Sequence, residues 1–190
     1  MRRVLKLASK ILLASSLLSA TAYADWVLDN NKSALYFVSI KNQNNAETHT
    51  FKTLSGTIDN NGTGSLSIDL TSVDSNIAIR NQRLRELLFM TDKFATTTVS
   101  IDLRTTGIKA GIQTINATLE LHGVKKDIPA TLAVTLVNNS IEVATVAPII
   151  LSAADFGLDG GITTLREIAS LQSISNAVPV TFFLSFTQQP

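Results

Sequence analysis

The segment that decides the fold class is Ala130-Thr131-Leu132-Ala133-Val134-Thr135-Leu136-Val137-Asn138-Asn139-Ser140-Ile141-Glu142-Val143. On both sides of Asn138-Asn139, large apolar residues alternate with polar or small ones, which is typical of strands with one buried face. Asparagine tolerates the positive φ that a two-residue turn needs, so the segment predicts a tight β-hairpin.

The same alternation recurs outward from this hairpin in both directions. Its apolar positions include Leu66, Ile68 and Leu70, then Val99, Ile101 and Leu103, then Ile115, Ala117, Leu119 and Leu121. Asn60-Asn61-Gly62 predicts a second hairpin, between strands at Phe51–Ile58 and Ser65–Leu70. Ala34–Ile40 predicts a first strand, and Val178–Phe186 predicts a long last strand that closes the sheet.

Two segments show helical spacing instead. Residues 75–89 place Ile77, Leu84 and Leu88 on one face, and Asp74 or Ser75 is expected to cap the start. Residues 161–171 predict a second short helix. About eight strands with such crossovers indicate a mainly β protein, a barrel or a sandwich, and an eight-stranded barrel is just wide enough for one slender ligand.

The N-terminus predicts a cleavable signal peptide over residues 1–24, followed by one domain over residues 25–190. A basic stretch precedes the short apolar run Ile11–Leu18, and Ala22-Tyr23-Ala24 fits a cleavage site. The apolar run is too short to span a bilayer, so we expect no membrane segment after cleavage and a periplasmic or secreted product. A membrane anchor that stays in place is the alternative.

Charge and cysteine content exclude several classes of function. Without the four basic residues of the predicted signal, 12 Lys and Arg face 15 Asp and Glu, a net charge of −3. A mildly acidic exported domain is a poor candidate for nucleic-acid binding. The chain has no cysteine, which excludes disulfides, thiol catalysis and thiolate metal sites.

No catalytic motif is recognisable, and we predict a protein that is not an enzyme and has no cofactor. His49 and His122 are the only histidines, and a metal site would require the fold to bring them together beside a carboxylate. We expect none, and interpret His122 as a turn residue. Asp155-Phe156-Gly157 is interpreted as a turn in which Asp155 bonds the backbone and Gly157 takes a positive φ.

Apolar residues near the two helical segments are the remaining candidates for a binding site. They are Phe37, Phe51, Leu84, Leu88, Phe89, Phe94, Phe156 and Leu165. Ordinary core packing is the alternative for all of them. Arg80, Arg83 and Arg85 lie on or beside the first helix, where a solvated face that Glu86 partly neutralises is the alternative.

Taken in order, several short motifs resemble those of the YceI-like family of periplasmic polyisoprenoid-binding proteins. They are Asp25-Trp26-Val27-Leu28-Asp29, Ser33-Ala34-Leu35-Tyr36-Phe37, Phe51-Lys52-Thr53-Leu54-Ser55-Gly56, Arg80-Asn81-Gln82-Arg83-Leu84-Arg85, Lys93-Phe94-Ala95, Leu119-Glu120-Leu121-His122-Gly123-Val124 and Asp155-Phe156-Gly157-Leu158. The chain departs from the family at Lys32, Ala95 and Ala153, where His, Pro and Arg are common.

The resemblance implies an antiparallel, lipocalin-like extended barrel with one or two short helices near its mouth, enclosing an apolar tunnel. It implies a carrier for an isoprenoid, a quinone or another long-chain amphiphile, a link to stress responses, and a possible homodimer. We therefore expect the tunnel wall to include Phe37, Phe51, Leu84, Leu88, Phe89, Phe156 and Leu165, with Arg80 and Arg85 near the headgroup. The alternative is a barrel filled by its own side chains that serves as an interaction module, and a hydrolase is a weaker third reading.

Overall fold

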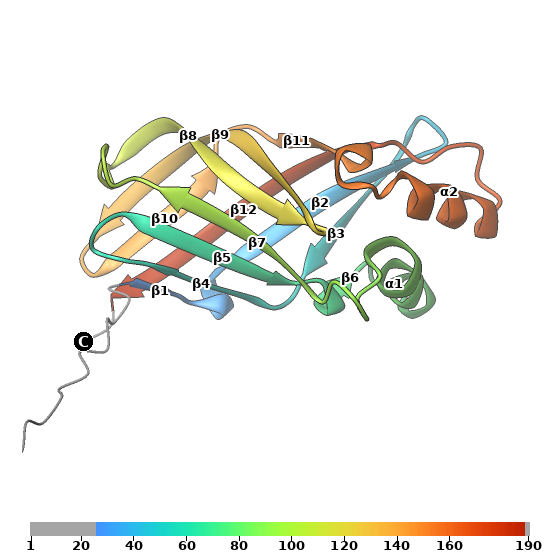
Figure 1. The fold of residues 1–190 in the computed structure, drawn as a ribbon, viewed down its shortest axis with the longest axis horizontal. Helices are drawn as coiled ribbons and strands as arrows, with labels where there is room; N and C mark the ends of the chain where they lie inside the picture. The colour runs from blue at the N-terminus through green and yellow to red at the C-terminus, as the bar shows by residue number, and fades with distance from the viewer. Residues whose placement is uncertain (1–25, 189–190) are drawn as a thin grey trace, which may run out of the picture.

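The computed structural model describes residues 26–188, which form a closed barrel of eight antiparallel strands (Figure 1). Each strand pairs with the next around the barrel, and β12 pairs with β1 to close it. In spatial order the eight are β1 (Trp26–Leu28), β4 (Leu54–Ile58), β5 (Thr63–Asp69), β7 (Thr96–Asp102), β8 (Gly111–Leu121), β9 (Val124–Val137), β10 (Ser140–Thr145) and β12 (Ala177–Gln188). The predicted mainly β, antiparallel barrel is confirmed, and the predicted signal peptide lies outside the described residues.

The long last strand, β12, organises both halves of the molecule. Its C-terminal half pairs with β10 and β1. Its N-terminal half pairs with β11 (Ile149–Ser152) and with β2 (Ala34–Lys41). From β2 the sheet continues to β3 (Asn45–Phe51) and β6 (Val73–Asp74), which extends the barrel wall at the end that carries the helices (Figure 1).

Both predicted hairpins are present. Val137 pairs with Ser140 across a turn in which Asn138 has a φ of +50°. Ile58 pairs with Gly64 across the second turn, and there Gly62 has a φ of +89°. The predicted strand over 51–58 is wrong in one respect, because Phe51 ends β3 and the adjacent β4 begins only at Leu54.

The first predicted helix differs from the structure in its start and in its geometry. Regular helix α1 covers only Ala78–Arg83, and the chain then continues as a π-helical segment, η3 (Leu84–Phe89). Neither Asp74 nor Ser75 caps α1, whose N-cap residue is Ile77 and has no side-chain capping bond. Both polar side chains are instead hydrogen-bonded to Asn81, one turn into the helix.

The second helix, α2, covers Asp159–Ile168, so it begins two residues before and ends three residues before the predicted span. Three 3₁₀ turns complete the fold: η1 (Asn30–Lys32), η2 (Leu70–Ser72) and η4 (Ala153–Phe156). Helices α1 and α2 lie at the same end of the barrel, where α2 contacts η3 (Figure 1). Within residues 26–188 no helix combines the length and the apolar character needed to cross a bilayer.

Candidate functional site

The interior of the barrel holds a cavity of about 560 Å³. Its wall is formed by inward-facing apolar residues from most of the strands, and α1, η3 and α2 contribute further residues at the helical end. Ile77 and Ile79 both line the cavity and are 44% and 53% exposed, so the cavity reaches the surface beside α1. We call this opening the mouth.

Most of the side chains that the sequence suggested as a binding site lie on this wall. The residues on the wall are Phe37, Phe51, Arg80, Leu84, Leu88, Phe89, Phe156 and Leu165. Arg85 is not among the lining residues, whereas Arg83, which was not selected, is. Phe94 lies elsewhere, against the imidazole of His122 with the ring centroids 4.3 Å apart.

The π-helical turn explains which residues of this segment reach the cavity. Hydrogen bonds in a π-helix join residues five apart, so residues four and five apart lie on nearly the same side. Leu84, Leu88 and Phe89 therefore all line the cavity. A regular helix over the whole segment would spread these three side chains over a wider arc.

Three phenylalanines and one histidine form an aromatic cluster on the wall. Phe37 stacks on Phe51 with the ring centroids 5.2 Å apart, and Phe89 closes the group at 5.6 Å from Phe51. His49 is the cross-strand partner of Phe37, and its ring centroid is 5.3 Å from that of Phe37. Sequence analysis missed His49 as a wall residue, although it shares one strand face with Phe51, two positions later.

Nearer the mouth the wall becomes charged. The Glu47 carboxylate accepts a hydrogen bond from Lys41 Nζ at 2.5 Å and a second from the Arg80 guanidinium. The hydrogen bond from Lys41, with the charge of Arg80, lowers the pKa of Glu47 against the opposing effect of burial. Lys41 and Arg80 line the cavity, whereas Glu47 is not among the lining residues, so this end of the wall presents two cations that pair with a neighbouring carboxylate.

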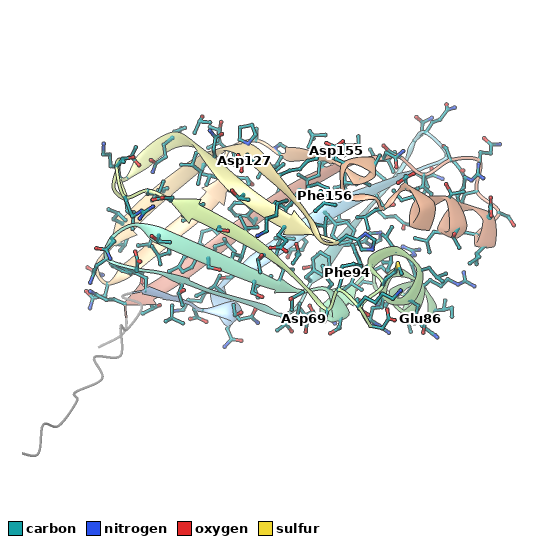
Figure 2. All side chains as sticks on the ribbon, in the orientation of Figure 1. Asp69, Glu86, Phe94, Asp127, Asp155 and Phe156 are labelled. Carbon is teal, nitrogen blue, oxygen red and sulfur yellow. The ribbon has the colours of Figure 1, made fainter. Side chains whose placement is uncertain are left out.

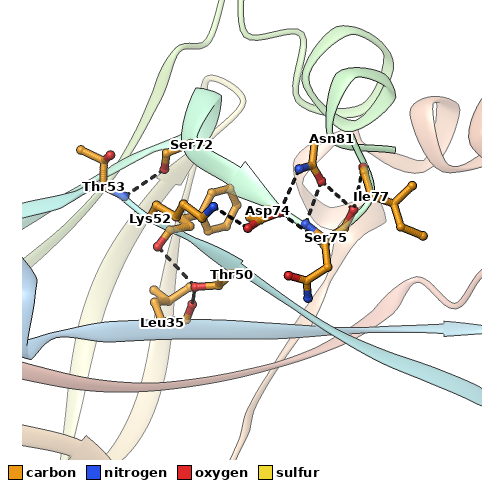
Figure 3. Close-up of polar contacts among 11 residues, drawn as sticks. Leu35, Thr50, Lys52, Thr53, Ser72, Asp74, Ser75, Ile77 and Asn81 are labelled. Atoms are coloured by element: carbon orange, nitrogen blue, oxygen red, sulfur yellow. Dashed lines mark hydrogen bonds and ion pairs between the residues drawn. The ribbon is translucent and has the colours of Figure 1, made fainter. Parts of the chain in front are cut away.

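A polar network fixes the start of α1 to β6 and to Lys52, the residue after β3 (Figure 3). Asp74 accepts hydrogen bonds from Lys52 Nζ at 2.6 Å and from Asn81 Nδ2 at 2.9 Å. Asn81 Oδ1 in turn accepts from the backbone N–H and the hydroxyl of Ser75. The bonds from Lys52 and then Asn81 hold the pKa of Asp74 well below its usual range. This network positions Ile77, Ile79 and Arg80 at the mouth.

The Asp155-Phe156-Gly157 turn anchors the wall near α2. Gly157 has the predicted positive φ, of +68°. The prediction that Asp155 bonds the backbone is wrong, because its carboxylate pairs with Lys126 Nζ at 3.0 Å. Phe156 is 1% exposed and turns into the barrel, while Asp155 stays outside (Figure 2). The Nδ1 atom of His122 lies 3.3 Å from the Phe156 carbonyl oxygen.

The two histidines face different parts of the protein. His49 lines the large cavity, and His122 lines a separate, smaller hollow together with Phe94 and Glu120. In the part of the chain that the structure describes, no group of three or more His, Asp or Glu side chains is arranged to hold a metal ion.

A closed antiparallel barrel around an apolar cavity defines the class of lipocalin-like barrels. The family model of the YceI-like domain matches residues 26–186, and the chain belongs to the YceI-like family. Comparison with curated proteins gave no match.

Solved structures agree with the family and the fold. A polyisoprenoid binding domain from Saccharophagus degradans, described as implicated in plant cell wall breakdown, is 38% identical, with a TM-score of 0.82 over 88% of this chain and 100% of that chain. BcnA of Burkholderia cenocepacia is 17% identical, with a TM-score of 0.68 over 83% of this chain and 98% of that one. A Campylobacter jejuni YceI protein, also 17% identical, has a TM-score of 0.56 over 75% of this chain and 85% of that one. The last two support the fold alone.

Proposed function

We propose that this protein is an exported, non-enzymatic carrier that holds an isoprenoid, a quinone or another long-chain amphiphile inside its barrel. The observation that carries the proposal is the apolar cavity of about 560 Å³. This volume lies within the usual range for small-molecule sites, roughly 300–1,000 Å³. The 38% identical domain from Saccharophagus degradans, which is described as polyisoprenoid binding, supports the same ligand class.

The energy of such binding comes from apolar surface removed from water. Each buried CH₂ contributes about 0.8 kcal/mol, so a twenty-carbon chain gains a gross ~16 kcal/mol before the costs of association. The polar end of the ligand is expected toward the mouth, the side of the cavity on which Lys41, Arg80 and Arg83 line the wall. In this role Arg83 replaces the Arg85 that the sequence suggested.

The main alternative, a barrel filled by its own side chains, predicts no sizeable cavity. A cavity of this volume in the barrel therefore favours the carrier over an interaction module that uses only its outer surface. A hydrolase would need a nucleophile beside a histidine in a cleft. Both histidines have an aromatic neighbour instead: Phe37 for His49, and Phe94 for His122.

Native mass spectrometry tests the proposal directly. The protein should be purified from the cells that make it, after which bound molecules are extracted into organic solvent and identified. We expect a long-chain amphiphile in near-stoichiometric amount and a cleaved N-terminus at Asp25. An empty protein that also takes up no added geranylgeraniol, a twenty-carbon isoprenoid alcohol, would contradict the carrier function.

A further inference from the structure

The imidazole of His49 is a polar group on the cavity wall, and its Nδ1 atom makes no hydrogen bond within the described part of the protein. His49 is 4% exposed. A buried polar atom without a partner costs about 1–3 kcal/mol, and native proteins contain few of them. The Nε2 atom of His122 is also buried without a partner, but His122 lies outside the large cavity. His49 is therefore the one such group of the described residues on the wall of this cavity, where its neighbours Phe37 and Phe51 are apolar.

The position of His49 suits a group that enters from the mouth. Along β2 and β3 the pairs on the strand face that includes His49 run from Phe37–His49 to Ser39–Glu47 and then to Lys41 at the end of β2. Successive pairs on one face are about 7 Å apart. His49 therefore lies one step deeper than the Glu47 ion pairs, where the charged rim changes into the apolar interior.

The surroundings favour an uncharged partner for this imidazole. Burial first, and then the positive charge of Arg80, lower the pKa of His49, so the ring is neutral near pH 7. A neutral imidazole offers one donor and one acceptor nitrogen. The Phe37 ring packs against it, and removing a full charge from water beside such rings is costly. Glu47 already pairs with both Lys41 and Arg80.

We propose that His49 binds the polar end of the amphiphile by a hydrogen bond, and that this end carries an uncharged oxygen, either a hydroxyl or a carbonyl. The assignment rests on the proposed carrier function and narrows its ligand class. It distinguishes long-chain alcohols, ketones and quinones from plain hydrocarbons, which leave the imidazole without a partner. It also distinguishes them from phosphorylated isoprenoids, whose charge would have to be desolvated next to Phe37.

Paired probes separate this hydrogen bond from apolar binding. The probes are geranylgeraniol, the hydrocarbon with the same carbon skeleton, and geranylgeranyl phosphate. His49→Phe keeps an aromatic ring but removes the hydrogen-bonding atoms. His122→Phe is the matched control, because His122 lines the separate hollow. We expect His49→Phe to weaken geranylgeraniol binding about three- to tenfold and to leave hydrocarbon binding unchanged or tighter, whereas His122→Phe changes neither.

A measurement on the unmodified protein covers the case in which His49→Phe does not fold. The chain has only two histidines, so ¹⁵N-labelled imidazole resonances are readily assigned. Geranylgeraniol should shift the His49 signals and leave those of His122 in place, and the hydrocarbon should shift neither by a comparable amount.

Three outcomes would overturn the assignment. The first is an equal loss of alcohol and hydrocarbon binding in His49→Phe, and the second is no loss of either. The third is tighter binding of geranylgeranyl phosphate than of the alcohol, which would show that the headgroup is anionic. A wild-type protein that binds none of the probes would overturn the carrier function itself, and the role of His49 with it.

Discussion

Gly161 of α2 lies so close to Leu87 of η3 that a Cβ atom on the glycine would be 2.6 Å from the Leu87 carbonyl oxygen. The same atom would be 2.9 Å from Leu88 Cα, so the obstacle is backbone that cannot rotate away. The close contact joins the two helical segments at the mouth. Gly160, the preceding residue, has nothing within 4 Å of its Cβ position.

The first prediction is that Gly161→Ala separates α2 from η3 and destabilises the protein by about 1–3 kcal/mol, because overpacking forces backbone shifts. Gly160→Ala is the matched control and should be neutral or stabilising by up to about 1 kcal/mol, since alanine favours helix. Urea unfolding measures both. Equal effects of the two substitutions would contradict the close packing at Gly161.

The second prediction concerns the volume of the cavity. Ala117 of β8 is buried and lines the cavity, so Ala117→Phe should fill part of it, keep the fold and weaken geranylgeraniol binding at least tenfold. Ala133→Phe is the control, because Ala133 pairs with Ile112, which is 71% exposed, and so lies on the outer face. Fluorescence competition measures binding. Unchanged affinity in Ala117→Phe would mean that the ligand does not occupy this cavity.

The parts of the fold that could be predicted are those that depend on residues close together in the sequence. The hairpin at Asn138 depends on alternation and on one positive φ, and both are properties of neighbouring residues. The start of α1 depends on hydrogen bonds that Asp74 and Ser75 make to Asn81, which compete with capping. Because these bonds form only once the chain has turned, spacing alone placed the helix three residues too early.

The binding wall was less predictable than the barrel for a related reason. Arg85 was selected, but it is Arg83 that lines the cavity, and the change from regular helix to the π-helical segment from Leu84 to Phe89 leaves no signal in the spacing of apolar residues. His49 was missed because alternation shows which residues face inward but not whether the interior there is packed or hollow. Only the arrangement of all the strands determines the cavity.

The third prediction concerns the stability of the protein at acidic pH. Bonds from Lys52 and Asn81 depress the pKa of Asp74 in the folded state, so its contribution to stability is present above the unfolded pKa, about 4, and is lost as the pH falls below it. Asp74→Asn should therefore be less stable than wild type at pH 7 and lose less free energy of unfolding between pH 5 and pH 2.5. Lys52→Gln removes the strongest of these bonds and should reduce the same acid-dependent loss. A pH dependence in Asp74→Asn identical to that of wild type would contradict this linkage.

The fourth prediction compares two phenylalanines that differ in burial. Phe156 is 1% exposed and lies on the cavity wall, whereas Phe183 is 41% exposed on the outer face of β12. Phe156→Ala should lower the free energy of unfolding by about 3–5 kcal/mol, because it removes a buried ring and leaves space that the barrel cannot close. Phe183→Ala should cost about 1 kcal/mol or less, because that ring is already partly in water. Urea denaturation of both variants measures the difference, and similar losses would mean that the Phe156 ring adds little to the packing beneath α2. If Phe156→Ala still folds, it should also enlarge the cavity and accept bulkier isoprenoids, which Phe183→Ala should not.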